Sequence, residues 1–440
     1  MTDANALDEA ALAPYLEEHV PGFRGLKAIR KFNSGQSNPT YLLEAASGRY
    51  VLRAKPPGEL LKSAHQVDRE FRVMTALRKT AVPVPEMLHL ASEDSPIGRM
   101  FYVMAFVDGR IFWDPALPEL ASNEERAAVS DAMNRVLAAL HDVNVEAAGL
   151  SDFGKPGSYF ERQLSRWTSQ YRASETEKLP DMDRLIEWLE KHLVADDGLV
   201  SLVHGDYRLD NMIFAADRAE VAAVLDWELS TLGHPYADIA YQCMQWRLPH
   251  KSGFRGLAGI DRKALGLPTE EEYIVTYCQR RGIDGIDNWV FYLAFSFFRL
   301  AAICQGVYKR ALDGNASNPE KARTYGEAVK LLWGLAARLI DEGREGMKRF
   351  AGRTVLLPAR PAVWAAAPPR DSQGEGPASS FRTSTPKRWR AWHRPSMRKP
   401  RRSPATLPRK AFPRASSPSP STASSPSISP STMPASPRIS

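Results

Sequence analysis

The fold of this chain is decided by a short polar stretch, His204-Gly205-Asp206-Tyr207-Arg208-Leu209-Asp210-Asn211. It directly follows an apolar pair, Leu202-Val203, which predicts a short strand. A second polar group, Asp226-Trp227-Glu228, follows another apolar strand predicted over Val221–Leu225. Strand ends hold side chains rigidly while the loops beyond them stay accessible. We therefore expect the chemistry of this protein to take place where these two groups meet.

The residue types in both groups suit the transfer of a phosphoryl group. This reaction needs a carboxylate that deprotonates the accepting hydroxyl group, and oxygen ligands that hold Mg²⁺ against the phosphates. Asp206 and Asn211 are five positions apart, as in the kinase catalytic loop H-R-D-x-x-x-x-N, with Gly205 in place of the Arg. Asp226 adds a hard carboxylate from the next strand end. The alternative is that these residues only tie a turn and line a solvated edge. The presence of both groups, in this order, favours chemistry.

The surrounding sequence predicts sheet first and helices later. Short strands are predicted over residues 28–32, 40–43, 49–54 and 101–104. A helix between them is predicted to open with a capping box, in which Ser63 caps and Gln66 reaches back. From about residue 118 the apolar residues recur with helical spacing. The most apolar stretch, 290–307, carries Arg299 in its middle, which favours a buried core helix over a membrane span.

Three motifs resemble the aminoglycoside phosphotransferase family, a branch of the protein-kinase-like fold. They are Ser34-Gly35-Gln36-Ser37-Asn38-Pro39-Thr40-Tyr41, Tyr50-Val51-Leu52-Arg53-Ala54-Lys55-Pro56-Pro57-Gly58 and the stretch from His204 to Asn211. They are most similar to the kinase-like domain of acyl-CoA dehydrogenase family members ten and eleven. The resemblance implies a bilobal α+β fold, with an antiparallel-sheet lobe at 1–108 and a mainly helical lobe at 109–356. The nucleotide would lie between the lobes.

The resemblance also implies roles for individual residues. Asp206 would be the catalytic base, Asn211 and Asp226 would be ligands of Mg²⁺, and Glu228 would assist the metal. The loop of Ser34, Gly35, Gln36, Ser37 and Asn38 would cover the phosphates of ATP with backbone N–H groups. Met104 to Val107 would form the hinge that offers backbone groups to adenine. Taken alone, the loop is equally well interpreted as an ordinary turn, and the hinge as a plain connection between a strand and a helix.

One cation on the strand at residues 50–54 is expected to contact the phosphates. Arg53 stands where the kinase pattern V-A-I-K has its Lys, and Lys55 would point to the same side if the strand continued. We favour Arg53, because Pro56 should end the strand just after Lys55. Its expected partner is Glu70, which the helical spacing puts on a buried face where an unpaired carboxylate would be costly.

Three further residues that follow the motifs receive structural roles. We expect Asp210 to brace the catalytic loop through backbone hydrogen bonds. Asp238 is expected to anchor that loop, as the family pattern G-x-P-x-x-D implies, and His234 is expected to be structural.

The last part of the chain differs sharply in composition from the rest. Residues 357–440 hold 15 basic and 2 acidic residues and 17 of the 33 prolines, whereas the preceding part is mildly acidic. Such a segment cannot bury enough apolar area to fold, so we predict a disordered tail. A basic arm for nucleic acid or membrane is one interpretation. We favour a solvated tail with no specific role, without a specific nucleic-acid or membrane partner.

These observations predict an ATP- and Mg²⁺-dependent phosphotransferase that acts on a hydroxyl group of a small molecule. Three scattered cysteines without a CxxC spacing suit a reducing cytoplasm. The resemblance points to a hydroxyacyl-CoA as acceptor, with an aminoglycoside or a choline-like molecule as the alternative. A degenerate kinase scaffold with a nucleic-acid-binding tail is the rival of another class. Four cations near aromatic residues are candidates for contacts with a CoA thioester: Arg162, Arg166, Arg247 and Lys251.

Overall fold

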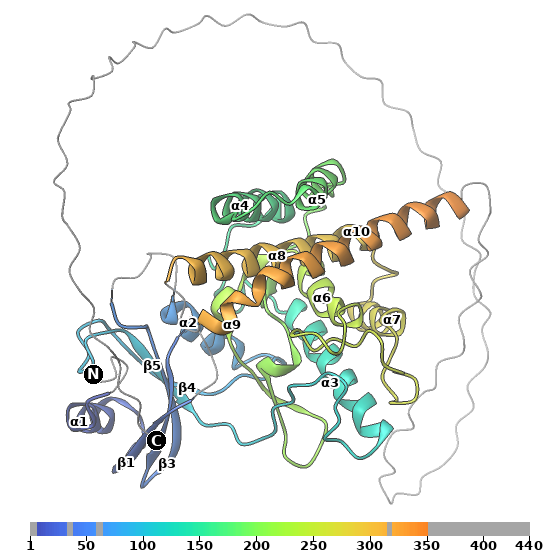
Figure 1. The fold of residues 1–440 in the computed structure, drawn as a ribbon. Coiled ribbons are helices and arrows are strands. Elements are labelled where there is room, and N and C mark those ends of the chain that lie inside the picture. Colours follow the sequence, from blue (N-terminus) through green and yellow to red (C-terminus); the bar gives the residue numbers. More distant parts are fainter. Residues whose placement is uncertain (1–6, 33–37, 59–64, 315–318, 351–440) are drawn as a thin grey trace, which may run out of the picture. The chain divides into compact units, whose positions relative to one another are not determined.

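The computed structural model describes residues 7–32, 38–58, 65–314 and 319–350 (Figure 1). The amino-terminal lobe contains a five-stranded antiparallel sheet in the order β1-β2-β3-β5-β4. Its elements are α1 (Glu9–His19), β1 (Leu26–Lys31), β2 (Thr40–Ala45), β3 (Gly48–Ala54), α2 (Val67–Leu77), β4 (Met87–Ala91) and β5 (Phe101–Ala105). The predicted strands of this lobe are all present.

The two faces of this sheet are covered by different helices, because successive side chains of a strand point to opposite faces. On β3, Leu52 and Ala54 pack in one apolar cluster with Leu12 and Leu16 of α1, which lies beside the sheet in Figure 1. Val51 belongs to the other cluster, with residues of α2. Arg53, two positions from Val51, therefore points to the α2 side.

Several features of this lobe differ from the sequence prediction. Helix α1 and strand β4 were not expected. The predicted capping box is wrong, since α2 begins at Val67 with Gln66 as its N-cap residue, and the Gln66 side chain makes no capping hydrogen bond. Ser63 lies outside the described residues.

The carboxy-terminal lobe is mainly helical, so the predicted α+β class with two unlike lobes is confirmed. Its helices are α3 (Asn123–His141), α4 (Tyr159–Ser174), α5 (Pro180–Lys191), α6 (Tyr236–Cys243), α7 (Glu270–Arg281), α8 (Trp289–Leu312), α9 (Pro319–Arg323) and α10 (Tyr325–Phe350). Two strand pairs and three short 3₁₀ segments carry the loops between them: β6 (Ser201–Val203), η1 (Leu209–Asn211), β7 (Met212–Phe214), β8 (Val221–Val224), η2 (Trp227–Leu229), β9 (Thr231–Gly233) and η3 (Met244–Trp246). Strands β7 and β9 were not predicted.

Helix α8 is the core helix of this lobe, and it packs against α4, α6 and α10. By length and composition alone it is the one helix in the described ranges that is apolar enough to cross a membrane. However, 72% of its apolar window is buried within the protein. Phe291, Phe295 and Phe298 all lie in the main apolar cluster. The stretch around Arg299 therefore forms a buried helix, as predicted.

Candidate active site

The loop that carries Asp206 is fixed at its start by a strand pair. Strand β6 pairs with β9, and Val203 lies opposite Thr231, so His204 emerges beside the end of η2. Gly205 adopts a φ of +84°, and a Cβ atom there would lie 2.7 Å from the carbonyl oxygen of Leu229. Only glycine fits such a position without strain. This close approach explains why a glycine precedes the aspartate where the kinase motif has arginine.

Asp238 of α6 holds the backbone of this turn. Its carboxylate accepts the N–H of His204 at 2.6 Å and the N–H of Gly205 at 2.9 Å, and it is fully buried. Burial by itself raises the pKa of Asp238, but the hydrogen bond and charge of His141, with His204 nearby, lower it below the ordinary value. The predicted anchoring contact is present. His234 is buried and stacks on Tyr292, which suits its expected structural role.

His204 connects the two polar groups that the sequence analysis singled out. Its Nδ1 accepts the N–H of Asp206 at 3.2 Å, so the ring proton lies on Nε2. Nε2 donates to the carbonyl oxygen of Leu225 at 2.9 Å, and Leu225 immediately precedes Asp226. The buried imidazole thus links the loop of the predicted base to the strand end of the predicted metal ligand.

The side chains of Asp206 and Asn211 meet, as their spacing predicts. Nδ2 of Asn211 donates to Oδ2 of Asp206 at 3.0 Å and to the backbone carbonyl oxygen of Asp206 at 2.9 Å. This arrangement leaves Oδ1 of Asn211 available as a ligand. Oδ1 of Asp206 is not bound by Asn211 and is the candidate to accept a proton. The hydroxyl group of Tyr241 is hydrogen-bonded to the Asp206 carboxylate, and burial together with the Asp206 charge raises the pKa of Tyr241.

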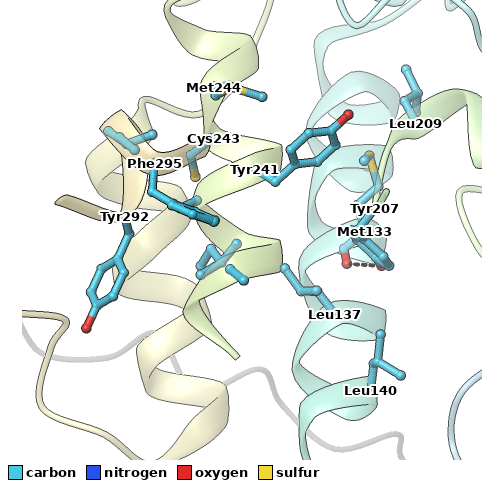
Figure 2. Close-up of a cluster of buried hydrophobic side chains, with 14 of the residues drawn as sticks. Met133, Leu137, Leu140, Tyr207, Leu209, Tyr241, Cys243, Met244, Tyr292 and Phe295 are labelled. Atoms are coloured by element: carbon cyan, nitrogen blue, oxygen red, sulfur yellow. Dashed lines mark hydrogen bonds between the residues drawn. The ribbon is translucent and has the colours of Figure 1, made fainter. Parts of the chain in front are cut away.

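The remaining residues of the loop anchor it in the core or brace it. Tyr207 points into the lobe beside Met133 and Leu137, and its hydroxyl group donates to the carbonyl oxygen of Met133 at 2.8 Å (Figure 2). Asp210 was expected to bind backbone N–H groups, and this expectation is wrong. Its carboxylate instead accepts two hydrogen bonds from the Arg208 guanidinium group, at 2.9 and 2.5 Å.

Asp226 reaches the same place from the second strand pair. Met212 pairs with Val224 in the β7–β8 hairpin, so Asn211 and Asp226 lie at one end of it. Asp226 has a φ of +64°, which is unusual for a residue with a side chain and turns the carboxylate out of the strand. Its Oδ1 accepts a hydrogen bond from Nη2 of Arg53 at 2.8 Å. Oε2 of Glu228 lies 3.8 Å from the same Nη2 atom.

Arg53 joins this group from the amino-terminal lobe. Its Nε atom is 3.0 Å from Oε2 of Glu70, so the predicted ion pair is present. Glu70 is fully buried, and it also accepts hydrogen bonds from Tyr102 and Asn38. Burial raises the pKa of Glu70, and the Arg53 charge opposes that rise. Lys55 lies beyond the end of β3, and its Nζ atom binds Glu93 instead. Of the two cations, Arg53 is therefore the one at the site.

The predicted phosphate loop lies mostly outside the described residues, which include only Asn38 of its members. The Asn38 side chain is 2% exposed and points into the lobe. Its Nδ2 donates to Glu70 at 2.8 Å, and its Oδ1 accepts from Nδ1 of His65 at 2.9 Å. Asn38 thus ties the end of the loop to the ion pair of Arg53, which the sequence did not reveal. That the loop covers phosphates stays a prediction.

The predicted hinge residues differ in what they can offer to a nucleotide. Met104 is buried within β5 and pairs with Val51 and Met87 on both sides. Val107 lies beyond the strand, and its backbone N–H and C=O make no hydrogen bond with any described residue. At the end of the hinge, a Cβ atom on Gly109 would lie 2.2 Å from the carbonyl oxygen of Phe214. Val107 is therefore better placed than Met104 to bind an adenine ring.

The donor set suits Mg²⁺. Within the described ranges, no group of three or more His, Cys, Asp or Glu side chains is arranged to hold a metal by itself. Magnesium, however, is usually bound by one or two protein oxygens together with substrate phosphates and water. Asn211 and Asp226 supply hard oxygen atoms at one end of the β7–β8 hairpin, and Glu228 follows in η2. These residues fit an ion that arrives with a nucleotide.

Of the four cations predicted to bind the acceptor, Arg247 and Arg162 are engaged by other groups of the protein, whereas Lys251 and Arg166 are exposed. Arg247 is ion-paired with Glu270 at 3.0 Å, and Arg162 donates to the carbonyl oxygens of Lys155 and Pro156. Lys251 is exposed on a loop. Arg166 lies against the ring of Trp167. Sequence reasoning missed Arg299, which reaches the catalytic loop from α8; its place inside an apolar stretch was the available signal.

Comparisons with known proteins agree with this geometry. A family model described as the phosphotransferase enzyme family matches residues 28–273. Acyl-CoA dehydrogenase family member 10 of Mus musculus is 45% identical over 84% of this chain and 35% of its own length. Acyl-CoA dehydrogenase family member 11 of Rattus norvegicus is 44% identical over 72% of this chain and 41% of its own length. The chain therefore spans less than half the length of these curated relatives.

Solved structures with the same fold are also known. A protein of Ralstonia eutropha described as an aminoglycoside phosphotransferase is 47% identical, with a TM-score of 0.69, over 77% of this chain and 99% of that chain. An aminoglycoside phosphotransferase in a ternary complex with AMP-PNP and hygromycin B is 15% identical, with a TM-score of 0.51, over 76% of this chain and 99% of that one. The second similarity concerns the fold alone.

Proposed function

Because this chain belongs to the phosphotransferase enzyme family, we propose that it transfers the γ-phosphate of ATP to a hydroxyl group of a hydroxyacyl-CoA. One observation carries the proposal: Asp206, Asn211 and Asp226 converge from two strand pairs, and Arg53 of the other lobe joins them. A degenerate scaffold would have no need of this combination. The residues also occur in the order in which the kinase motifs place them along the chain.

In the proposed reaction, Oδ1 of Asp206 accepts the proton of the acceptor hydroxyl group. The acceptor oxygen forms a bond to the γ-phosphorus, the bond between that phosphorus and the bridging oxygen breaks, and ADP leaves. Asn211 holds the other oxygen of Asp206, so the base presents a single fixed atom. Arg53, which is positioned by its ion pair with Glu70, would contact the phosphates of ATP. When bound by Asn211 and Asp226, Mg²⁺ supplies positive charge against the phosphate oxygens.

The proposal of a CoA thioester as acceptor rests on the relatives. Both curated relatives bear the name of acyl-CoA dehydrogenases, and the aligned region is only part of each. Phosphorylation of a hydroxyacyl-CoA would turn a poor leaving group, hydroxide, into a good one. An aminoglycoside or a choline-like acceptor is the alternative outcome of the test described next.

The test is a nucleotide-consumption screen of the purified protein with ATP and Mg²⁺. The acceptors are a 4-hydroxyacyl-CoA, the corresponding free hydroxy acid, kanamycin and choline, and ³¹P NMR identifies a phosphate ester. Asp206→Asn serves as the inactive variant. Asp217→Asn is its matched control, because Asp217 is an exposed residue of the β7–β8 turn that contacts Arg218. The proposal requires ester formation on the CoA thioester that depends on Asp206 and not on Asp217.

A further inference from the structure

A buried cation lies directly beneath the catalytic loop. Arg299 of α8 is 6% exposed, and its Nη2 atom donates to the carbonyl oxygen of Gly205 at 2.7 Å. Its guanidinium carbon lies 5.7 Å from the ring centroid of Trp167 and 5.4 Å from that of Tyr241. The guanidinium group is thus held between two aromatic rings, one peptide unit from the base.

Arg299 is not neutralised in the way buried cations usually are. It makes no ion pair with a carboxylate of any described residue. Buried charges are normally paired, because an isolated one is strongly disfavoured away from water. A guanidinium group has five N–H donors, and the Gly205 carbonyl uses one of them. Arg299 therefore retains donors and charge for a group that is not part of the described chain.

A second cation continues this surface towards solvent. Arg166 of α4 lies with its guanidinium carbon 5.4 Å from the Trp167 ring centroid and is exposed. Within the described ranges, its guanidinium group makes no hydrogen bond or ion pair. Tyr159 lies close to both cations: burial raises its pKa, and the charges of Arg299 and Arg166 oppose that rise. Arg166, Trp167 and Arg299 thus form a cationic and aromatic wall beside Asp206.

We propose that this wall is the acceptor subsite, in which Arg299 and Arg166 bind carbonyl and negatively charged oxygen atoms of the molecule that is phosphorylated. The inference rests on the proposed phosphotransfer and adds the charge of the acceptor. Arg299 binds the carbonyl group of the residue before the base, and its remaining donors would meet a carbonyl group near the reacting hydroxyl. Arg166 meets a phosphate or carboxylate group farther out. A polycationic acceptor would face like charge, which is costly at such short range. The wall therefore selects against amino sugars.

The decisive variant is Arg166→Glu, compared with Lys27→Glu. Lys27 is exposed on β1 of the other lobe, so both variants change the net charge equally. Steady-state kinetics are measured with a 4-hydroxyacyl-CoA, the free hydroxy acid and a neutral diol of the same chain length. Arg166→Glu should raise KM about tenfold for the negatively charged acceptors, with little change for the diol. Arg166→Lys should restore most of the loss, and Lys27→Glu should change nothing.

Arg299 needs a separate pair of variants, because it also holds the loop. Arg299→Lys keeps the charge and Arg299→Gln removes it, while both lose the planar fork. If Arg299 binds the acceptor, the Gln variant raises the acceptor KM more than the Lys variant does. A purely structural role would lower kcat in both variants and leave the ratio of KM values for charged and neutral acceptors unchanged. That second pattern would overturn the role of Arg299.

Failure of the proposed function can be separated from failure of the subsite. Calorimetric titration with CoA alone measures binding of its phosphate groups without any turnover. CoA binding that is weakened by Arg166→Glu and not by Lys27→Glu supports the subsite even if no acceptor is phosphorylated. Efficient phosphorylation of kanamycin, or equal effects of both charge reversals, overturns the subsite while the phosphotransferase activity stands.

Discussion

The two loops that meet at the site are held in different ways. The loop from His204 to Asn211 is fixed within one lobe, by Asp238, Arg299 and the buried Tyr207. The turn at Asp226 has a strained backbone, and its carboxylate is held from the other lobe by Arg53. The base is therefore built into the helical lobe. The predicted metal ligand, in contrast, is held by a contact between the lobes.

The largest effect is expected from the base itself. Asp206→Asn keeps the shape and the contact with Asn211, but an amide cannot accept the hydroxyl proton. Turnover should fall about 10²- to 10⁴-fold while ATP still binds, as measured by steady-state kinetics and nucleotide titration. Because the loop is fixed without this charge, the melting temperature should stay near that of the parent. Near-normal turnover would remove Asp206 from its role.

The second prediction concerns the turn at Asp226. Asp226→Ala removes a hard oxygen ligand and the partner of Arg53. The rate should fall, and the Mg²⁺ concentration for half-maximal rate should rise about 10- to 100-fold. A titration with Mg²⁺ at saturating ATP measures the change, with Asp217→Ala as control. An Asp226→Ala variant with the Mg²⁺ dependence of the parent would show that the second loop has been misassigned.

The third prediction concerns the ion pair between Arg53 and Glu70, which is the buried part of the contact between Arg53 and the two carboxylates. Arg53→Met leaves the carboxylate of Glu70 buried without a cation, and removal of one partner of such a pair costs about 3 to 5 kcal/mol. Arg53→Met combined with Glu70→Leu should recover most of the stability but not the activity. Chemical denaturation of the single and double variants measures both effects. Equal stability of parent and Arg53→Met would show that the bridge contributes nothing.

This variant also predicts a pH dependence with a definite sign. Burial raises the pKa of Glu70, and Arg53 makes the largest contribution that lowers it, so the loss of Arg53 should raise this pKa further. A carboxyl group with a raised pKa binds its proton more readily when folded, so stability falls as the pH rises through that pKa. The destabilisation of Arg53→Met should therefore shrink as the pH is lowered from neutral towards the ordinary pKa of a carboxyl group. A destabilisation independent of pH would assign the loss to packing instead.

The fourth prediction concerns the tight turn before the base. Gly205→Ala places a Cβ atom 2.7 Å from the Leu229 carbonyl oxygen at a φ of +84°. Strain of this kind costs about 1 to 3 kcal/mol, and displacement of Asp206 should lower kcat as well. Gly285→Ala is the matched control, because a Cβ atom there meets nothing within 4 Å. Similar melting temperatures for the two variants would contradict the close approach.

The same comparison shows what the sequence could predict. The pairing of Asp206 with Asn211 follows from their spacing within one loop, and the meeting of Arg53 with Glu70 follows from strand alternation and helical spacing. Arg299 was missed as a site residue, because its contact with Gly205 spans 94 positions and depends on how α8 packs. The side-chain contacts of Asn38 could not be predicted for the same reason, since its partners Glu70 and His65 come from distant positions.

Other differences arise where tertiary packing overrides local pattern. The amino-terminal helix α1 has a weak apolar pattern, yet Leu12 and Leu16 are fully buried against the sheet. Strands β7 and β9 are three residues long and form only because their partners are present. In α2, the expected capping box was displaced by a start at Val67. Motifs with their own chemistry could be predicted, whereas elements stabilised by neighbours could not.

The smallest effect is expected from the basic tail, and it tests whether both loops are held entirely by residues before it. Truncation after Arg353 removes the Pro- and Ser-rich segment, whose composition predicts few packed contacts. The melting temperature should change by less than about 2 °C, and kcat by less than about twofold, at physiological salt. At low salt the loss of 15 basic residues should weaken ATP binding slightly, because positive charge on the chain attracts polyphosphates non-specifically. A loss of the cooperative melt would make the tail part of the fold. A selective rise in the Mg²⁺ requirement would instead show that the tail supports the turn at Asp226. That turn would then be held by the tail as well as by Arg53.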